Sequence, residues 1–225
     1  MSAGQGVAQV SEALSEVRER IAGAGGDPAR VRVVAVTKGF GPGAVSAALR
    51  AGMPDVGESY AEELLRKAAE PSLAGAELRW HYLGAIQRRK IPRLCDRVSC
   101  WHGLARVVEA ESLSRRSPGA RVFVEVDLVG GRQGCPPEGV GALVDRLLEL
   151  PLEVAGLMAV APRGPSGQAR AAFRRVASLA RSAGLAELSM GMSDDFEEAV
   201  AEGATTVRLG RALFGPRPPR RTLEE

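Results

Sequence analysis

Lysine is scarce in this chain, and one lysine directly follows its most hydrophobic predicted strand. Of the 30 basic residues, only Lys38, Lys67 and Lys90 are lysines. Lys38 closes the run VRVVAVTK, whereas Lys67 lies in AEELLRKAAE, a pattern typical of a solvated helical face. An amine forms an imine with an aldehyde, and a guanidinium does not. Lys38 is therefore the candidate for covalent chemistry, with a plain surface lysine as the alternative.

Two later segments carry groups that suit an anion. The segment SMGMSDD offers the small Gly191 and the hydroxyl of Ser193 at an expected helix N-terminus, where backbone N–H groups are available. In VRLGRALFG, Gly210 permits a close approach and Arg208 supplies a cation just before it. Taken singly, Ser193 could be an ordinary helix cap, Gly210 a turn glycine and Arg208 half of an interior ion pair.

The elements that must position these residues follow a regular rhythm. Short β-branched or apolar runs alternate with longer stretches rich in Ala, Leu, Glu and Arg, which indicates βαβ units and a parallel sheet. The predicted strands are 31–37, 54–57, 79–83, 97–101, 121–128, 152–159, 186–190 and 205–209. The predicted helices are 43–51, 58–69, 86–94, 103–115, 137–149, 166–183, 194–202 and a short one from 211.

Eight such units predict the fold class α/β, as a single modified (β/α)₈ TIM barrel with an extra N-terminal helix. The extra helix is indicated by a stripe of apolar residues at steps of three and four, formed by Val7, Val10, Leu14, Val17 and Ile21. A doubly wound open sheet is the alternative, but TKGFGPG lacks the G-x-G-x-x-G spacing of its first turn. We expect one domain over 1–225, with a helix and linker over 1–30 and an exposed tail over 216–225.

In a barrel the carboxyl ends of the strands meet at one mouth, where phosphate sites follow strands 7 and 8. Lys38, Ser193 and Arg208 would converge there. A lysine facing an anion site fits a Schiff base to a phosphorylated aldehyde, for which pyridoxal 5′-phosphate (PLP) is the obvious candidate. His81, at the end of the third strand, could line the same pocket or be a satisfied core histidine. His102 at the end of the fourth strand has the same two interpretations.

Composition excludes several classes of protein. Net charge is only +3 and aromatic content 4%, which argues against a nucleic-acid binder. No stretch approaches the roughly 20 apolar residues of a membrane span. Three cysteines without a CxxC pair, and two histidines without an H-x-x-x-H pair, argue against a disulfide framework and a metal site. We expect a cytoplasmic protein.

Several motifs together resemble the pyridoxal phosphate homeostasis protein family. They are AVTK (35–38), VGESYAEELLRKA (56–68), WHYLGAIQRRK (80–90), GLMAVAP (156–162), LSMGMSDDFEEAV (188–200) and VRLGRALFG (207–215). The resemblance implies a fold-type III PLP-binding barrel, similar to the N-terminal domain of alanine racemase. It also implies a monomer that holds PLP as an internal aldimine, helps to control its supply and could pass it to PLP-dependent apo-enzymes.

Residue roles follow from the same resemblance. Lys38 resembles the Schiff-base lysine, Arg208 the partner of the pyridine nitrogen, and Ser193 with the backbone at Gly210 and Arg211 the phosphate site. The predicted cofactor-binding residues are Lys38, Ser193, Arg208, Gly210, Arg211, Met192, Ser59 and His81. No catalytic or metal-binding residue is predicted.

The chain departs from the family pattern at four positions. Ser59 stands where the family usually has the asparagine of G-E-N-Y, and Arg211 where Ser or Thr is frequent. Arg89 replaces an asparagine of the Q-x-N-K pattern, and Ala105 an aspartate. Cofactor affinity is therefore expected to differ from that of relatives.

Two enzyme alternatives remain open. The first is a fold-type III racemase or lyase with Lys38 as its base. Such racemases also use a tyrosine from a second domain, and here only residues 215–225 follow the last predicted element. The tyrosines Tyr60 and Tyr82 are both predicted to pack in the barrel. The second alternative is a PLP-independent barrel enzyme acting on a sugar phosphate.

Overall fold

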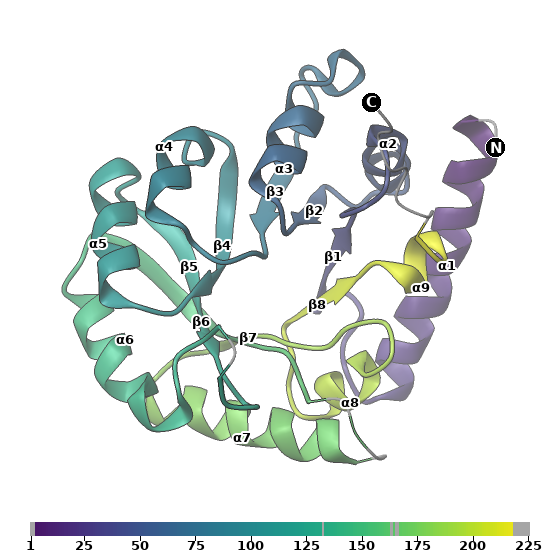
Figure 1. Ribbon diagram of the computed structural model, residues 1–225. Coiled ribbons are helices and arrows are strands. Elements are labelled where there is room, and N and C mark those ends of the chain that lie inside the picture. The colour runs from purple at the N-terminus through teal and green to yellow at the C-terminus, as the bar shows by residue number, and fades with distance from the viewer. Residues whose placement is uncertain (1–2, 132, 163, 165–166, 218–225) are drawn as a thin grey trace.

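Eight parallel strands close into a barrel in the order β1 to β8, as predicted. The computed structural model describes residues 3–131, 133–162, 164 and 167–217. The strands are β1 (Arg32–Val36), β2 (Asp55–Glu58), β3 (Arg79–Tyr82), β4 (Val98–Leu104), β5 (Ala120–Val126), β6 (Leu152–Ala159), β7 (Glu187–Ser189) and β8 (Thr206–Leu209). Because the strands are parallel, all their carboxyl ends open at one mouth of the barrel (Figure 1).

Helices surround the barrel and follow the strands in sequence (Figure 1). They are α1 (Ala3–Gly23), α2 (Pro42–Arg50), α3 (Ala61–Ala68), α4 (Ile91–Leu94), α5 (Val107–Arg116), α6 (Val140–Leu148), α7 (Gln168–Ser182), α8 (Phe196–Ala201) and α9 (Arg211–Phe214). Short 3₁₀ turns are η1 (Pro71–Leu73), η2 (Arg88–Lys90) and η3 (Pro137–Gly139). Among the described residues, none of the helices has the length and apolar character needed to cross a membrane.

The predicted N-terminal stripe packs α1 against the barrel. Val10, Leu14, Val17 and Ile21 are all buried, and α1 contacts α2, α8 and α9. Figure 1 shows α1 lying alongside α9. Of the predicted tail over 216–225, residues 218–225 lie outside the described part of the chain.

The fourth strand is longer than predicted. β4 continues past 101 to Leu104, which pairs with Val124 of β5, so the helix predicted from 103 begins only at Val107. The extension passes close to another segment, since a Cβ on Gly103 would lie 2.5 Å from the carbonyl oxygen of Gly84. His102 therefore lies within the strand and not at its end.

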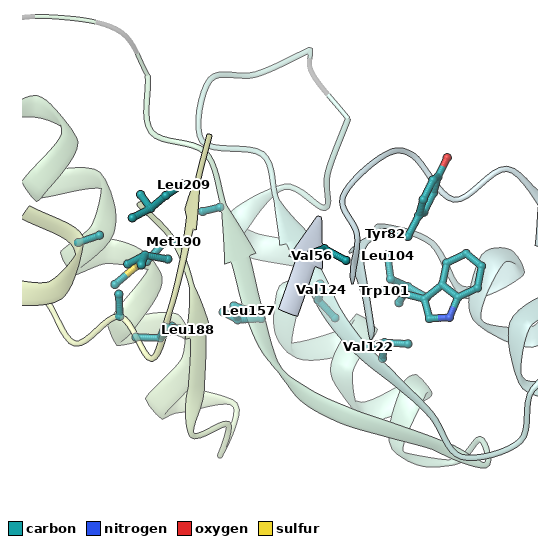
Figure 2. Packing of buried hydrophobic residues seen from close by; sticks show 14 of the residues in the cluster. Val56, Tyr82, Trp101, Leu104, Val122, Val124, Leu157, Leu188, Met190 and Leu209 are labelled. Atoms are coloured by element: carbon teal, nitrogen blue, oxygen red, sulfur yellow. The ribbon is translucent and has the colours of Figure 1, made fainter. Parts of the chain in front are cut away.

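The outer and inner faces of the barrel strands carry different kinds of side chain. The main apolar core lies between the strands and the helices, and Figure 2 shows part of it, including Val56, Val122, Val124, Leu157 and Leu209. The second apolar cluster consists of Cys100, Phe123 and Met158, with partly buried neighbours. Residues alternate between faces along a strand, so neighbours of the outer core residues point inward. Buried polar residues, among them His81, His102 and Arg208, occupy several of those inward positions.

Candidate functional site

Lys38 lies just beyond the carboxyl end of β1, half-buried at the mouth of the barrel. Its Nζ lies 3.3 Å from the Oγ of Ser59, which follows β2 directly. Burial lowers the pKa of the Lys38 amine, and the nearby cations of Arg217 and Arg208 lower it further. A lowered pKa increases the fraction of neutral amine, which is the nucleophilic form.

Helix α3 holds the backbone on both sides of Lys38. Lys67 Nζ donates to the carbonyl oxygen of Thr37 at 2.7 Å, and the carboxylate of Glu63 accepts from the N–H of Gly39 at 2.7 Å. Lys67 also contacts Glu58 at 2.6 Å and Glu63 at 2.8 Å. The residues before and after Lys38 are thus fixed to one helix through charged groups.

This arrangement corrects the prediction made for Lys67. The pattern AEELLRKAAE indicated a solvated face, but the Lys67 side chain is completely buried against β2. Burial of a lysine requires a carboxylate partner, and Glu58 of β2 supplies it. Tyr60 is a second correction, since it is 52% exposed and does not pack in the barrel. Tyr82 is buried as predicted and packs edge-on against Trp101 (Figure 2).

The segments after β7 and β8 meet beside the end of β1. The Oγ of Ser193 accepts a hydrogen bond of 3.1 Å from the N–H of Ala212, at the start of α9. Its hydroxyl proton is then available to donate to a ligand. Gly210 lies close to β1, because a Cβ there would lie 3.2 Å from the carbonyl oxygen of Val36.

Arg211 and Met192 lie at the outer edge of this region. The Arg211 side chain is exposed and pairs with Asp194, so its guanidinium is engaged at the surface. Met192 is 38% exposed, and its N–H donates to the carboxylate of Asp195 at 2.6 Å. Among the described residues, no hydrogen bond or ion pair joins either side chain to Lys38 or Ser193.

Arg208 is a buried cation on the inner face of β8. Its Nη1 donates to the carbonyl oxygen and the Oγ of Ser189, at 2.5 and 2.8 Å, and its Nη2 donates to the carbonyl oxygen of Ala159 at 2.8 Å. Burial lowers the pKa of Arg208 to about 10, with Glu125 and Asp195 opposing the shift. The guanidinium therefore stays charged at neutral pH, and it has N–H groups left for a ligand.

His81 is more buried than the other predicted site residues. Its Nε2 is 2.9 Å from the carboxylate of Asp55, and its Nδ1 is 2.8 Å from the Nε2 of His102. Both of its ring nitrogens are therefore hydrogen-bonded to protein groups. The structure brings Lys38 and Ser59 together, whereas His81 reaches the site only through other side chains.

Glu125 is a residue of the site that the sequence motifs did not single out. It lies near the carboxyl end of β5, beside a cavity of about 240 Å³ that Gln133 and Val160 also line. Gln133 donates to its carboxylate at 2.9 Å. Burial raises the pKa of Glu125 to about 7, although Arg208 opposes the shift. A carboxyl group with this pKa exchanges protons near neutral pH.

The Lys67→Met variant tests the support of the loop around Lys38. It removes the buried cation and leaves Glu58 without its partner, so we expect the free energy of unfolding to fall by about 3 kcal/mol. Urea denaturation measures this loss. The control is Lys90→Met, because Lys90 pairs with Glu62 near the surface at 3.5 Å and should cost less than about 1 kcal/mol. Equal losses in both variants would contradict the role given to Lys67.

The Glu125→Gln variant should change how stability depends on pH. The pKa of Glu125 is about 7 in the folded protein, above its ordinary value of 4.5. Its contribution to stability is therefore complete below about pH 4.5 and is lost as the pH rises through about 7. Glutamine does not ionise, so the stability of the variant relative to the parent should rise over this range. Denaturation curves at several pH values, with exposed Glu138→Gln as control, measure the difference; a constant offset would contradict the raised pKa.

Comparison with known proteins agrees with this geometry. Residues 12–218 match the family model of the alanine racemase N-terminal domain. The chain is 39% identical over 218 residues to the pyridoxal phosphate homeostasis protein of Pseudomonas aeruginosa, covering 92% of this chain and 94% of that protein. The protein of the same name from Deinococcus radiodurans is 37% identical, with 91% and 99% covered.

Comparison with solved structures also points to the fold of PLP-binding proteins. The structure of PipY from Synechococcus elongatus PCC7942 with PLP bound has a TM-score of 0.83 and 30% identity, covering 92% of this chain and all of that one. Alanine racemase from Corynebacterium glutamicum shares the fold, with a TM-score of 0.71, at 18% identity. The chain therefore belongs to the pyridoxal phosphate homeostasis protein family, which has the barrel of the alanine racemase N-terminal domain.

Proposed function

We propose that this chain binds PLP at the mouth formed by the carboxyl ends of β1, β7 and β8, and holds it through the Nζ of Lys38. The homeostasis proteins of this family and the PLP-bound PipY structure support the choice of ligand. When bound, PLP supplies an aldehyde carbon that bonds to an amine and a ring that accepts electrons. The protein holds PLP and releases it, which limits the concentration of free PLP aldehyde.

The observation that carries this proposal is the position of Lys38 relative to the other two lysines. Lys67 is buried in ion pairs with Glu58 and Glu63, and Lys90, at the end of η2, pairs with Glu62 of α3. Lys38 alone of the three directly follows a strand of the barrel, and burial with nearby cations lowers the pKa of its amine. It is the lysine suited to bond to an aldehyde at neutral pH.

The surrounding groups fit the remaining parts of PLP. Arg208 offers a buried guanidinium suited to the ring nitrogen, because a neutral nitrogen lone pair accepts from a cationic donor. Ser193 offers a hydroxyl proton to the phosphate, and Gly210 and Arg211 offer backbone amides beside it. Ser59, which contacts Lys38 Nζ, would replace the amide of the usual asparagine with a shorter hydroxyl.

We further propose that the protein does not turn over amino acids. Arg208 keeps its proton at neutral pH, so it does not fully protonate a ring nitrogen, which weakens the ring as an electron acceptor. Neither tyrosine is placed to serve as a second acid, since Tyr60 points to solvent and Tyr82 packs against Trp101. We propose that it holds PLP as a cytoplasmic monomer and supplies it to apo-enzymes.

A fold-type III racemase or lyase is the second candidate function, and Glu125 is the observation in its favour. The pKa of Glu125 is raised to about 7 by burial, and the group lies beside a cavity near the mouth. A racemase needs a proton donor on the face opposite its lysine. Glu125 is the described carboxyl group suited to that task, so the second candidate predicts that activity depends on it.

Reductive trapping tests the role of Lys38. Borohydride reduction after incubation with PLP should leave the pyridoxyl group on the peptide that contains Lys38, because its amine is accessible at the mouth. Peptide mass mapping locates the label. The Lys38→Ala variant should lose it and keep part of the non-covalent affinity through Ser193 and Arg208. A label confined to Lys67 or Lys90 would refute the assignment.

Addition of D- or L-alanine to the PLP-loaded protein separates the two candidate functions. We expect the absorbance spectrum to change, since exchange of amines needs only Lys38 and the incoming amine, while the enantiomeric composition stays constant. Chiral chromatography and the visible spectrum are followed together. Racemisation near the enzyme median of about 10 s⁻¹, abolished by Glu125→Gln, would establish the second candidate.

A further inference from the structure

A continuous chain of buried side chains crosses the inside of the barrel. Asp55 of β2 contacts His81 of β3 at 2.9 Å, and His81 contacts His102 of β4 at 2.8 Å. The Nδ1 of His102 is 2.9 Å from the Oγ of Ser189 on β7, and that oxygen accepts from Arg208 of β8 at 2.8 Å. All five residues are at most 6% exposed.

With neutral rings, the carboxylate end of this chain determines the direction of every hydrogen bond in it. A carboxylate only accepts, so His81 Nε2 carries a proton for Asp55. The Nδ1 of a neutral His81 is then an acceptor, and the bond between the histidines runs from His102 Nε2–H to His81 Nδ1. Both neutral histidines are therefore in the Nε2–H tautomer. The bare Nδ1 of His102 accepts the proton of Ser189, whose Oγ accepts from the guanidinium of Arg208.

The surroundings favour neutral rings and an ionised aspartate. Burial lowers the pKa of His81 and, more strongly, that of His102, whose ring stacks on Phe123 at 4.7 Å between centroids. Burial works against ionisation of Asp55, but hydrogen bonds from Arg79 and His81 hold the pKa of its carboxyl below the usual value. Arg79 also binds both oxygens of Asp55, at 2.8 and 2.6 Å, which anchors that end.

The same arrangement argues against a metal site at this place. Ligand atoms of His81, Cys100 and His102 lie within 4.8 Å of one another. A metal ion needs a lone pair from each imidazole. The Nδ1 lone pair of His81 is taken by His102, and that of His102 is taken by Ser189. The cluster is therefore a hydrogen-bond chain.

We propose that Ser189, His102, His81 and Asp55 are positioning residues that hold the guanidinium of Arg208 in one orientation. Buried polar groups cost free energy unless all are satisfied, so a fully bonded chain admits few alternative arrangements. Ser189 also holds Arg208 through its carbonyl oxygen, and Ala159 holds the other Nη. The N–H groups left over then point consistently toward the ligand. The inference rests on the proposed function in one respect, that Arg208 faces the ring nitrogen of PLP.

The first test uses the protein without cofactor. The sequence contains only two histidines, so ¹⁵N-histidine labelling gives a spectrum with few signals. Long-range ¹H–¹⁵N correlation at neutral pH should show both rings neutral and in the Nε2–H tautomer. The Asp55→Asn variant removes the anchoring charge and should give a mixture of tautomers at His81. A charged ring, or an Nδ1–H tautomer in the parent protein, would overturn the chain.

The second test measures whether Ser189 acts through Arg208. PLP and its 1-deaza analogue, which has carbon in place of the ring nitrogen, are titrated into the parent protein and Ser189→Ala. The parent should prefer PLP by about tenfold or more, as for one hydrogen bond to a charged group, and Ser189→Ala should lose most of that preference. Ser189→Thr, which keeps the hydroxyl, should restore it. Ser114→Ala is the matched control, since Ser114 is buried on α5 and donates to Glu111 at 3.1 Å.

The outcomes separate the two proposals. Equal weakening of both ligands in Ser189→Ala indicates general structural damage and overturns the positioning role. A parent protein that binds both ligands at Lys38 without preference keeps the proposed function but overturns the positioning of Arg208 toward the ring nitrogen. Failure to bind either ligand overturns the proposed function, and the tautomers measured without cofactor then decide whether the chain itself exists.

Discussion

The burial of one positive charge, that of Arg208, constrains the inside of this barrel. A guanidinium inside a protein must have its donors satisfied, because an unpaired buried charge is strongly destabilising. The hydrogen bonds of Arg208 reach β6 and β7, and its serine partner continues the network to β4, β3 and β2. Six strands thus contribute groups to one polar network. This explains why the interior has only a small apolar cluster, while most of the apolar core lies outside the strands.

A second network, on the outer face of the barrel, holds the backbone next to Lys38. Thr37 and Glu58 lie on the outer face, where the Thr37 hydroxyl donates to the Glu58 carboxylate. Lys67 of α3 donates to that carboxylate and to the carbonyl oxygen of Thr37. Their neighbour Lys38 points toward the mouth, because successive residues alternate between the two faces. A buried ion pair in the outer layer therefore supports a reactive amine in the inner one. Lys38 and Arg208, the two groups proposed to bind PLP, are supported by separate networks, one on each face of the sheet.

Within the proposed function, the groups at the mouth suit holding PLP better than turning over amino acids. The lowered pKa of Lys38 suits amine exchange, whereas Arg208, which keeps its proton at neutral pH, would withdraw few electrons from a bound ring. Glu125 is the one described feature that points in the other direction, because its pKa lies near neutrality. Alanine racemase from Corynebacterium glutamicum shares the barrel at low identity, and this chain covers 63% of its length. Fold alone does not separate the two roles, and the groups at the mouth must do so.

The sequence by itself determined the barrel, its order of elements and the place of Lys38, Ser193 and Gly210. These follow from local patterns, since alternating apolar runs and glycine-marked turns act over a few residues. Only the tertiary structure shows that Lys67 is buried, because a helical pattern in the sequence does not reveal that Glu58 lies buried opposite it. It also decided that both histidines lie buried inside the barrel and that Glu125 lies beside a cavity. His102 meets Ser189 across 87 positions of sequence, and only closure of the barrel brings such distant groups to hydrogen-bonding distance.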